Sequence, residues 1–153
     1  MITSRKYLMD ISLSQEHQSI FEMAYEFGQK QIAPNALAWE KDGTIPKELW
    51  KQAGELGLGG IYVSEKYGGS GLNRLDASLI FEAMAMACPS VSSFLTIHNM
   101  CGGMIEKFGS EELKEKWLPR LCKMEMIFSY CLSEPNSGSD AAALKTKAIK
   151  TNE

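Results

Sequence analysis

The spacing of apolar residues changes near residue 122, and this change limits what the chain can fold into. Before it, apolar side chains recur at intervals of three and four residues, which places them on one face of a helix. After it, residues 126–128 form an apolar run too short for a helix, and residues 143–150 alternate as a half-exposed strand does. We therefore expect a mainly α chain, with an all-α domain over residues 1–122. Residues 123–153 are expected to begin a truncated β domain.

Helix boundaries follow from residues that cap or interrupt helices. Ser, Asn and Asp side chains accept hydrogen bonds from the free N–H groups of a first turn. Proline is tolerated in a first turn, and glycine commonly ends a helix. These rules predict five or six helices. The expected starts are Ser12 or Ser14, Pro46, Asn73 or Asp76, and Ser110, with breaks at Pro34, Gly43, Gly57, Pro89 and Gly109.

Two glycine-containing stretches separate the predicted helices in the middle of the chain. Residues 57–63 have few large side chains and are expected to be an extended connection. Residues 65–71 lack both the Gly-Lys-Ser/Thr ending of a P-loop and the G-x-G-x-x-G spacing of a dinucleotide site. The second stretch is therefore interpreted as a flexible loop between helices.

Composition excludes several classes of function. A net charge of −3 without a basic cluster argues against a nucleic-acid partner. No apolar run approaches the roughly 20 residues of a membrane span. The four cysteines contain no C-x-x-C pair, so we expect reduced thiols and no metal site. Residues 1–8 are basic and free of acid; they are too few to identify a transit peptide, and the remnant of one is the open alternative.

Neither histidine has the partners of a catalytic or metal site. His98 lies among small and apolar neighbours, with no carboxylate or cysteine at ligand spacing. A buried histidine with satisfied hydrogen bonds is the preferred interpretation for this position. His17 is expected to face solvent in a first helical turn. Two isolated histidines do not form a catalytic group.

Residues 129–140 combine hydroxyl side chains with turn-forming residues. Pro135 and Gly138 prevent a helix there, while Ser133, Ser137 and Ser139 bring hydroxyls into the turn. Such a loop presents O–H and N–H donors to a phosphate or to the polar edge of a ring. An ordinary surface turn is the alternative, and composition alone favours it.

Residues 130–140, Tyr-Cys-Leu-Ser-Glu-Pro-Asn-Ser-Gly-Ser-Asp, resemble the flavin-binding signature of the acyl-CoA dehydrogenases. Residues 65–71, 81–83 and 108–112 also resemble that family in order and spacing. The resemblance extends from about residue 13 to residue 149. Within the family, residues 96–101 are most similar to the members that oxidise isobutyryl-CoA in valine breakdown.

The resemblance implies an enzyme that binds FAD and desaturates an acyl-CoA between its α and β carbons. A glutamate removes the α proton, and the β hydrogen leaves as hydride to the flavin. Electrons then pass to an electron-transferring flavoprotein. The family fold is a helical domain, a β domain and a second helical domain, usually in a homotetramer. The resemblance also implies the mitochondrial matrix.

The same resemblance implies roles for individual residues. The expected FAD contacts are Tyr130, Cys131, Leu132, Ser133, Glu134, Pro135, Asn136, Ser137, Gly138 and Ser139. The expected acyl-CoA contacts are Ser139, Ser92, Ser93, Thr96 and Met100, although core packing is an equal alternative for Met100. Ser133 stands where the family usually has threonine, which keeps the hydroxyl but removes a methyl that limits its rotamers. Looser positioning of the hydroxyl is expected there.

No glutamate of this chain matches the family's catalytic glutamate, which would lie beyond Glu153. The 153-residue chain is therefore expected to lack dehydrogenase activity and to bind FAD weakly or not at all. A non-catalytic helical bundle, acting as a binding or assembly module, is the alternative function.

Overall fold

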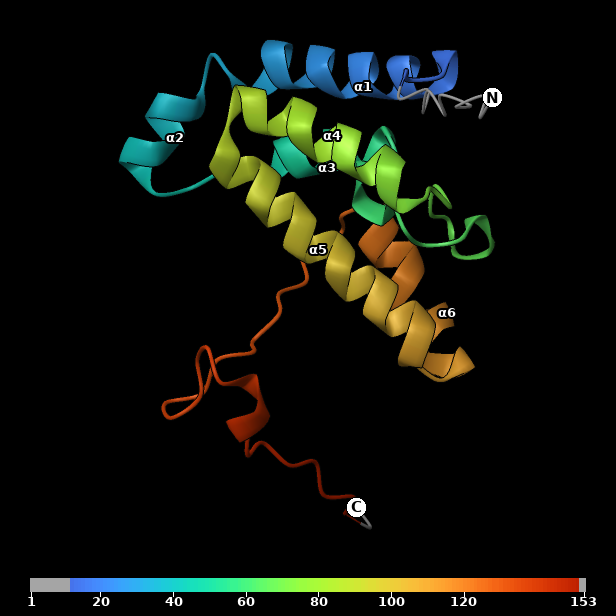
Figure 1. Ribbon diagram of the computed structural model, residues 1–153, viewed down its shortest axis with the longest axis vertical. Helices are drawn as coiled ribbons and strands as arrows, with labels where there is room; N and C mark the ends of the chain where they lie inside the picture. The colour runs from blue at the N-terminus through green and yellow to red at the C-terminus, as the bar shows by residue number, and fades with distance from the viewer. Residues whose placement is uncertain (1–11, 152–153) are drawn as a thin grey trace, which may run out of the picture.

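The computed structural model describes residues 12–151, in which six α-helices form a bundle and an extended segment follows it (Figure 1). The helices are α1 (Gln15–Phe27), α2 (Ala36–Asp42), α3 (Lys47–Glu55), α4 (Arg74–Ala87), α5 (Pro89–Phe108) and α6 (Glu111–Cys122). A π-helical turn, η1 (Gly28–Ile32), continues α1, and short 3-10 turns lie at η2 (Leu58–Gly60), η3 (Glu65–Tyr67) and η4 (Ala141–Ala143).

The predicted capping residues begin their helices. Ser14 Oγ accepts a hydrogen bond from the His17 N–H at 3.1 Å and starts α1. Asn73 and Asp76, which the sequence offered as alternatives, act together at the start of α4. The Asn73 side chain accepts from the Asp76 N–H, while the Asp76 carboxylate accepts from the Asn73 N–H at 3.0 Å. Ser110 caps α6. These local predictions are confirmed.

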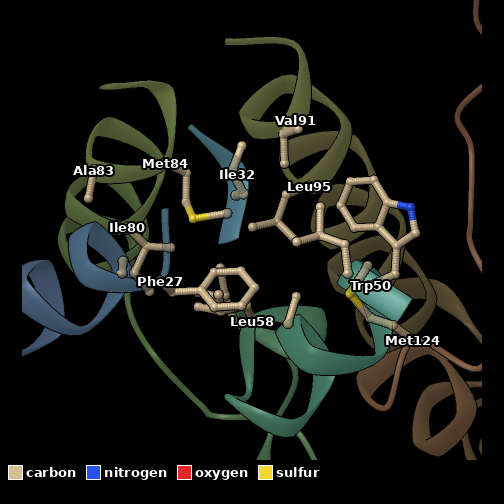
Figure 2. Close-up of a cluster of buried hydrophobic side chains, with 14 of the residues drawn as sticks. Phe27, Ile32, Trp50, Leu58, Ile80, Ala83, Met84, Val91, Leu95 and Met124 are labelled. Atoms are coloured by element: carbon tan, nitrogen blue, oxygen red, sulfur yellow. The ribbon is translucent and has the colours of Figure 1, made fainter. Parts of the chain in front are cut away.

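The bundle packs in sequence order, with α1 against α4, α4 against α5, and α5 against α6 (Figure 1). Figure 2 shows the main core, where buried side chains of α1, η1, α3, η2, α4 and α5 meet Met124, while α2 contributes only the partly buried Trp39. Trp50 of α3 stacks on Phe94 of α5, with ring centroids 4.4 Å apart. A smaller cluster joins α6 to the segment before α4 and consists of Val63, Tyr67, Leu118, Leu121 and Cys122.

Residues 57–72 are neither an extended connection nor a flexible loop, so both predictions for them are wrong. The chain turns through η2 and η3 and folds back on itself. Three backbone N–H groups, of Ser70, Gly71 and Leu72, each donate at 2.8 Å to carbonyls of residues 60–63. Alternation and glycine content could not reveal these bonds, because their partners lie about ten residues apart.

Asn99 of α5 holds this irregular segment from inside the bundle. Its side chain is almost fully buried. The Asn99 amide donates to the Leu58 carbonyl at 2.8 Å, and its oxygen accepts from the Ile61 N–H at 2.7 Å. A buried loop needs such partners, because its backbone groups have neither a helix nor water to bind.

The end of α6 approaches η2 more closely than a side chain would allow. A Cβ atom on Gly59 would overlap the Cys122 carbonyl oxygen, and one on Gly60 would overlap the Cys122 sulfur. Two residues later, Met124 has a φ of 52° and its side chain enters the main core beside Trp50 (Figure 2). The turn that directs the chain out of the bundle is therefore fixed by close backbone packing.

The strands expected at residues 126–128 and 143–150 do not form within residues 12–151. The structure there has one isolated antiparallel bridge, between Glu134 and Ser137. A strand requires a neighbouring strand for its ladder, and the described residues supply none to either segment. The mainly α fold is confirmed, whereas the β character of residues 123–151 is limited to extended chain and turns.

We expect Gly59→Ala to lower the free energy of unfolding by about 1–3 kcal/mol, because the added methyl overlaps backbone that cannot move independently. Gly103→Ala is the matched control. That glycine lies inside α5, and its Cβ would stand 3.8 Å from Tyr62, an ordinary contact. The control should be neutral or stabilise by up to about 1 kcal/mol. Urea unfolding followed by circular dichroism measures both, and equal effects would contradict the packing argument.

Asn99→Ala should lower the free energy of unfolding by at least about 2 kcal/mol, since it leaves the buried Ile61 N–H and Leu58 carbonyl unpaired. Asn35→Ala is the control. The Asn35 amide also donates to a backbone carbonyl, that of Gln31 at 3.0 Å, but at the surface. Its removal should change stability by less than about 0.5 kcal/mol. Thermal unfolding of the two variants compares them, and a small loss for Asn99→Ala would count against the role of the loop bonds.

Candidate functional site

One exposed stripe of α5 contains three of the predicted acyl-CoA contacts. Ser93, Thr96 and Met100 recur at helical spacing, and Ile97 lies between them on the same stripe. We call these four residues the α5 outer face. Ser93 and Ile97 are exposed, and Thr96 and Met100 are half-buried. The Thr96 hydroxyl donates to the Ser92 carbonyl at 2.8 Å, which leaves its methyl group for the face. The face is therefore largely apolar, with one hydroxyl at Ser93.

Ser92 does not share this face. Its side chain is buried, and its hydroxyl donates to the Phe81 carbonyl of α4 at 2.8 Å. Successive helical residues point about 100° apart, so Ser92 and Ser93 serve different neighbours. In this structure Ser92 connects α4 to α5. Ile97 was missed by the sequence analysis, although its position four residues after Ser93 and three before Met100 was a usable signal.

Residues 129–140, which we call the signature segment, leave the bundle beyond Phe128 and are mostly exposed (Figure 1). Within the segment, the backbone of Glu134 and Ser137 exchanges two hydrogen bonds, at 2.9 and 3.0 Å. The Ser137 side chain is buried against the segment itself, and its hydroxyl donates to the Asp140 carbonyl at 2.7 Å. Ser137 therefore shapes the turn. Ser133 and Ser139 are exposed.

Glu134 closes a loop between the turn and the chain that follows. Its carboxylate accepts hydrogen bonds from the backbone N–H groups of Lys145 and Thr146, each at 2.8 Å. The Thr146 hydroxyl donates to the same carboxylate. These hydrogen bonds lower the pKa of Glu134 below its usual value. The hydroxyl has the largest effect, and the two N–H groups add to it. The carboxylate of Glu134 thus stabilises the conformation of the segment from within.

His98 joins α5 to the residues just before the signature segment. Its ring is fully buried, with Nε2 3.1 Å from the Leu121 carbonyl and Nδ1 3.2 Å from the Phe128 nitrogen. Burial lowers the pKa of the imidazole, opposed by hydrogen bonds to the backbone of Leu121 and Gly59. The expectation of a buried histidine with satisfied hydrogen bonds is confirmed.

The structure therefore brings the predicted residues together only in part. The α5 outer face and the signature segment each form a continuous unit. Within residues 12–151, no hydrogen bond joins one to the other. Just before the segment, the Phe128 N–H donates to His98 Nδ1 of α5 at 3.2 Å. Burial, followed by the nearby Cys131, raises the pKa of the Cys101 thiol, which indicates that the segment passes close to α5.

Two cavities of the bundle lie away from these residues. One of about 760 Å³ runs between α3 and the turn after α6, and three lysines and three glutamates line it. Another of about 630 Å³ lies between α2, α3 and the start of α5, and Trp39, Trp50 and Phe94 contribute to its wall. Neither is lined by a predicted FAD or acyl-CoA contact. The predicted contacts thus lie outside these two cavities.

Two findings concern metals and membranes. Among residues 12–151, no three His, Cys, Asp or Glu side chains gather as metal ligands would. In the same part of the chain, none of the helices combines the length and apolar character that crossing a membrane requires.

Comparison with known proteins identifies the class of this helical domain. Residues 14–125 match the acyl-CoA dehydrogenase N-terminal domain. The chain therefore belongs to the acyl-CoA dehydrogenase family.

Among individual relatives, the mitochondrial isobutyryl-CoA dehydrogenase of Dictyostelium discoideum is 50% identical over 92% of this chain. The enzyme of the same name from Bos taurus is 43% identical over 94% of the chain. A solved FAD complex of PigA is 34% identical over 87% of the chain, with a TM-score of 0.80, and the match covers 36% of that protein. This chain spans about a third of the length of both isobutyryl-CoA dehydrogenases, 34% in each case.

The loop that Glu134 closes should respond to pH through the carboxylate of that residue. Because the pKa of Glu134 is lowered, its carboxylate should stabilise the loop above about pH 4.5, and this contribution should disappear as pH falls through the lowered pKa. The amide proton shifts of Lys145 and Thr146 in nuclear magnetic resonance (NMR) spectra should titrate with that midpoint. Glu134→Gln should remove the titration, and Glu125→Gln, a nearby surface control, should leave it. A titration midpoint at or above pH 4.5 would contradict the hydrogen bonds from Lys145 and Thr146 to Glu134.

Proposed function

We propose that this chain forms the N-terminal part of an FAD-dependent acyl-CoA dehydrogenase that desaturates a short, branched acyl-CoA such as isobutyryl-CoA. The observation that carries the proposal is the 50% identity to an isobutyryl-CoA dehydrogenase over 92% of the chain. The identity falls to 36–38% for relatives named as acryloyl-CoA reductase or as acyl-CoA dehydrogenases from Bacillus subtilis. An isovaleryl-CoA dehydrogenase is also 37% identical, so within the family similarity favours isobutyryl-CoA in particular.

The signature segment has the donors that a flavin dinucleotide would need. Ser133 and Ser139 are exposed hydroxyls, and the turn between them is held by its own backbone bonds and by Glu134. A preformed turn with outward O–H and N–H groups suits phosphates and the polar edge of a ring. When bound, FAD would accept the hydride from the substrate. Glu134 and Ser137 would contribute by shaping the loop, because their side chains already bind its backbone.

The α5 outer face would meet the acyl group. Ile97, Met100 and the Thr96 methyl group offer apolar contact without a charged side chain, which suits a short branched hydrocarbon. A face of this kind would orient the acyl chain and exclude water from one side of it. Ser139, in the signature segment, would lie on the CoA side of the substrate. Ser92 would act indirectly, through the packing of α4 against α5.

The remaining parts of the activity would come from outside these 153 residues. The family resemblance implies a catalytic glutamate beyond Glu153, and the chain spans only about a third of the length of the two isobutyryl-CoA dehydrogenases. We therefore propose that the chain alone is inactive and holds FAD weakly or not at all. The complete protein would form a homotetramer, pass electrons to an electron-transferring flavoprotein and reside in the mitochondrial matrix. The mitochondrial relatives support that location.

A chimera tests the proposal directly. This chain would replace the corresponding N-terminal third of the Dictyostelium discoideum enzyme, and FAD absorbance and isobutyryl-CoA-dependent dye reduction would be measured. The chimera should contain flavin and reduce the dye, whereas the 153-residue chain alone should do neither. A folded chimera without flavin would overturn the proposal and favour a non-catalytic helical module. Dye reduction by the chain alone would overturn its predicted inactivity.

Within the chimera, Met100→Trp should lower kcat/KM for isobutyryl-CoA by at least about 10-fold, because the indole would fill space on the α5 outer face where the acyl group binds. Leu37→Trp is the control, since Leu37 of α2 is 87% exposed and lies outside the predicted site. It should leave kcat/KM unchanged. Equal kinetics for the two variants would show that Met100 belongs to the core instead.

A further inference from the structure

The His98 ring has a defined tautomer because each ring nitrogen lies within hydrogen-bond distance of one backbone group, the Leu121 carbonyl at Nε2 and the Phe128 N–H at Nδ1. The Phe128 N–H can only donate, so Nδ1 must be the unprotonated acceptor. Nε2 then carries the proton and donates to the Leu121 carbonyl at the end of α6. A single neutral form satisfies both contacts. Burial, which lowers the pKa of the ring, favours this neutral form.

Phe128 is fixed to this ring in two ways. Besides the N–H bond, its aromatic ring lies edge-on to His98 at 6.1 Å and edge-on to Trp117 at 6.3 Å between centroids. On either side of Phe128 the chain is exposed, at Ile127 and again over residues 129–133. Phe128 is therefore the last attachment of the chain to the bundle before the signature segment.

The two bonds of His98 have different consequences. The bond to Leu121 joins α5 to α6 and would stabilise the bundle whether or not a segment followed it. The bond to Phe128 attaches a residue that lies beyond α6, although the Phe128 ring also packs against Trp117 of α6 and the smaller core cluster. It determines where along α5 the chain departs. Ile97 of the α5 outer face immediately precedes His98, so the departure point lies at the same level along α5 as that face, on a different side of the helix.

We propose that His98 is a positioning residue, whose Nδ1 holds the Phe128 N–H and thereby fixes the signature segment relative to the α5 outer face. The consequence for flavin and substrate rests on the proposed function, but the positioning itself does not. Without the Nδ1 acceptor, the segment would keep its internal turn, which depends on Glu134 and Ser137. It would lose its fixed position relative to α5.

The hydrogen bond can be measured in the unaltered chain. A donated N–H bound to a ring nitrogen produces a scalar coupling between the two nitrogen nuclei, so nitrogen-15 NMR should show coupling between the Phe128 amide and His98 Nδ1. The Nε2 nitrogen should have the shift of a protonated ring nitrogen. Absence of the coupling in a folded chain, or protonation at Nδ1, would overturn the proposal. This measurement needs no flavin and no variant.

Variants then separate positioning from stability. His98→Leu removes both bonds at similar volume, and His98→Gln retains a donor and an acceptor. Val91→Ala is the control, because Val91 is buried in the same helix and contacts the main core instead of Phe128. We expect His98→Leu to shift the amide resonances of residues 129–133 and to speed exchange of the Phe128 amide by about 10-fold, the effect of one lost hydrogen bond. His98→Gln should restore much of this protection.

The Val91→Ala control distinguishes a specific effect on the signature segment from a general loss of stability. Val91→Ala should lower the melting temperature but leave the resonances of residues 129–133 in place. If Val91→Ala moved them as much as His98→Leu, His98 would be an ordinary core residue and the proposal would be wrong. In the chimera, His98→Leu should reduce the FAD content more than Val91→Ala does. If the two variants had equal FAD content while the coupling between Phe128 N and His98 Nδ1 was present, the result would count against the proposed function and not against the positioning.

Discussion

The fold depends on two adjacent polar side chains in the middle of α5. They form hydrogen bonds with backbone groups that no helix of the bundle satisfies. Asn99 binds backbone groups of Leu58 and Ile61, and His98 binds those of Leu121 and Phe128. Each partner lies where the chain leaves helical geometry. A backbone group buried there without a partner would cost about 1–3 kcal/mol. The irregular segments can enter the bundle only because α5 carries these two residues.

The close contact between two glycines of η2 and the end of α6 is a second constraint on the fold. The two polar side chains fix hydrogen bonds, while Gly59 and Gly60 allow α6 to end against η2 at backbone contact distance. That contact decides where Met124 enters the core and where the chain turns outward. A larger residue in η2 would displace α6, and with it the Leu121 carbonyl that binds His98. The glycine contact and the histidine bond thus act on the same point, the exit of the chain from the bundle.

Hydrogen bonds between residues close in sequence could be predicted from the sequence. Those between residues far apart in sequence could not. Ser14, Asn73 and Ser110 cap helices through bonds to residues two or three positions away, so spacing alone predicted them. The backbone bonds that hold residues 57–72, and the missing ladder of residues 143–150, depend on partners that spacing does not identify. Ser92 illustrates the same limit within the candidate site. Resemblance named it as a contact, but only the structure showed that its hydroxyl binds Phe81.

The α5 outer face and the signature segment are held in place in different ways. This difference affects how accurately the two can be positioned relative to each other. The α5 outer face belongs to a rigid helix whose opposite side is the core. Within the described residues, the signature segment makes no hydrogen bond to the bundle after that of Phe128, yet it is ordered internally by Glu134 and Ser137. An element with a stable shape but a single hydrogen bond to its support can be placed accurately only if that bond is specific. A directional hydrogen bond to a buried ring meets this need better than apolar packing, because it fixes direction as well as distance. Accurate placement of ligand-binding groups is what catalysis by orientation requires.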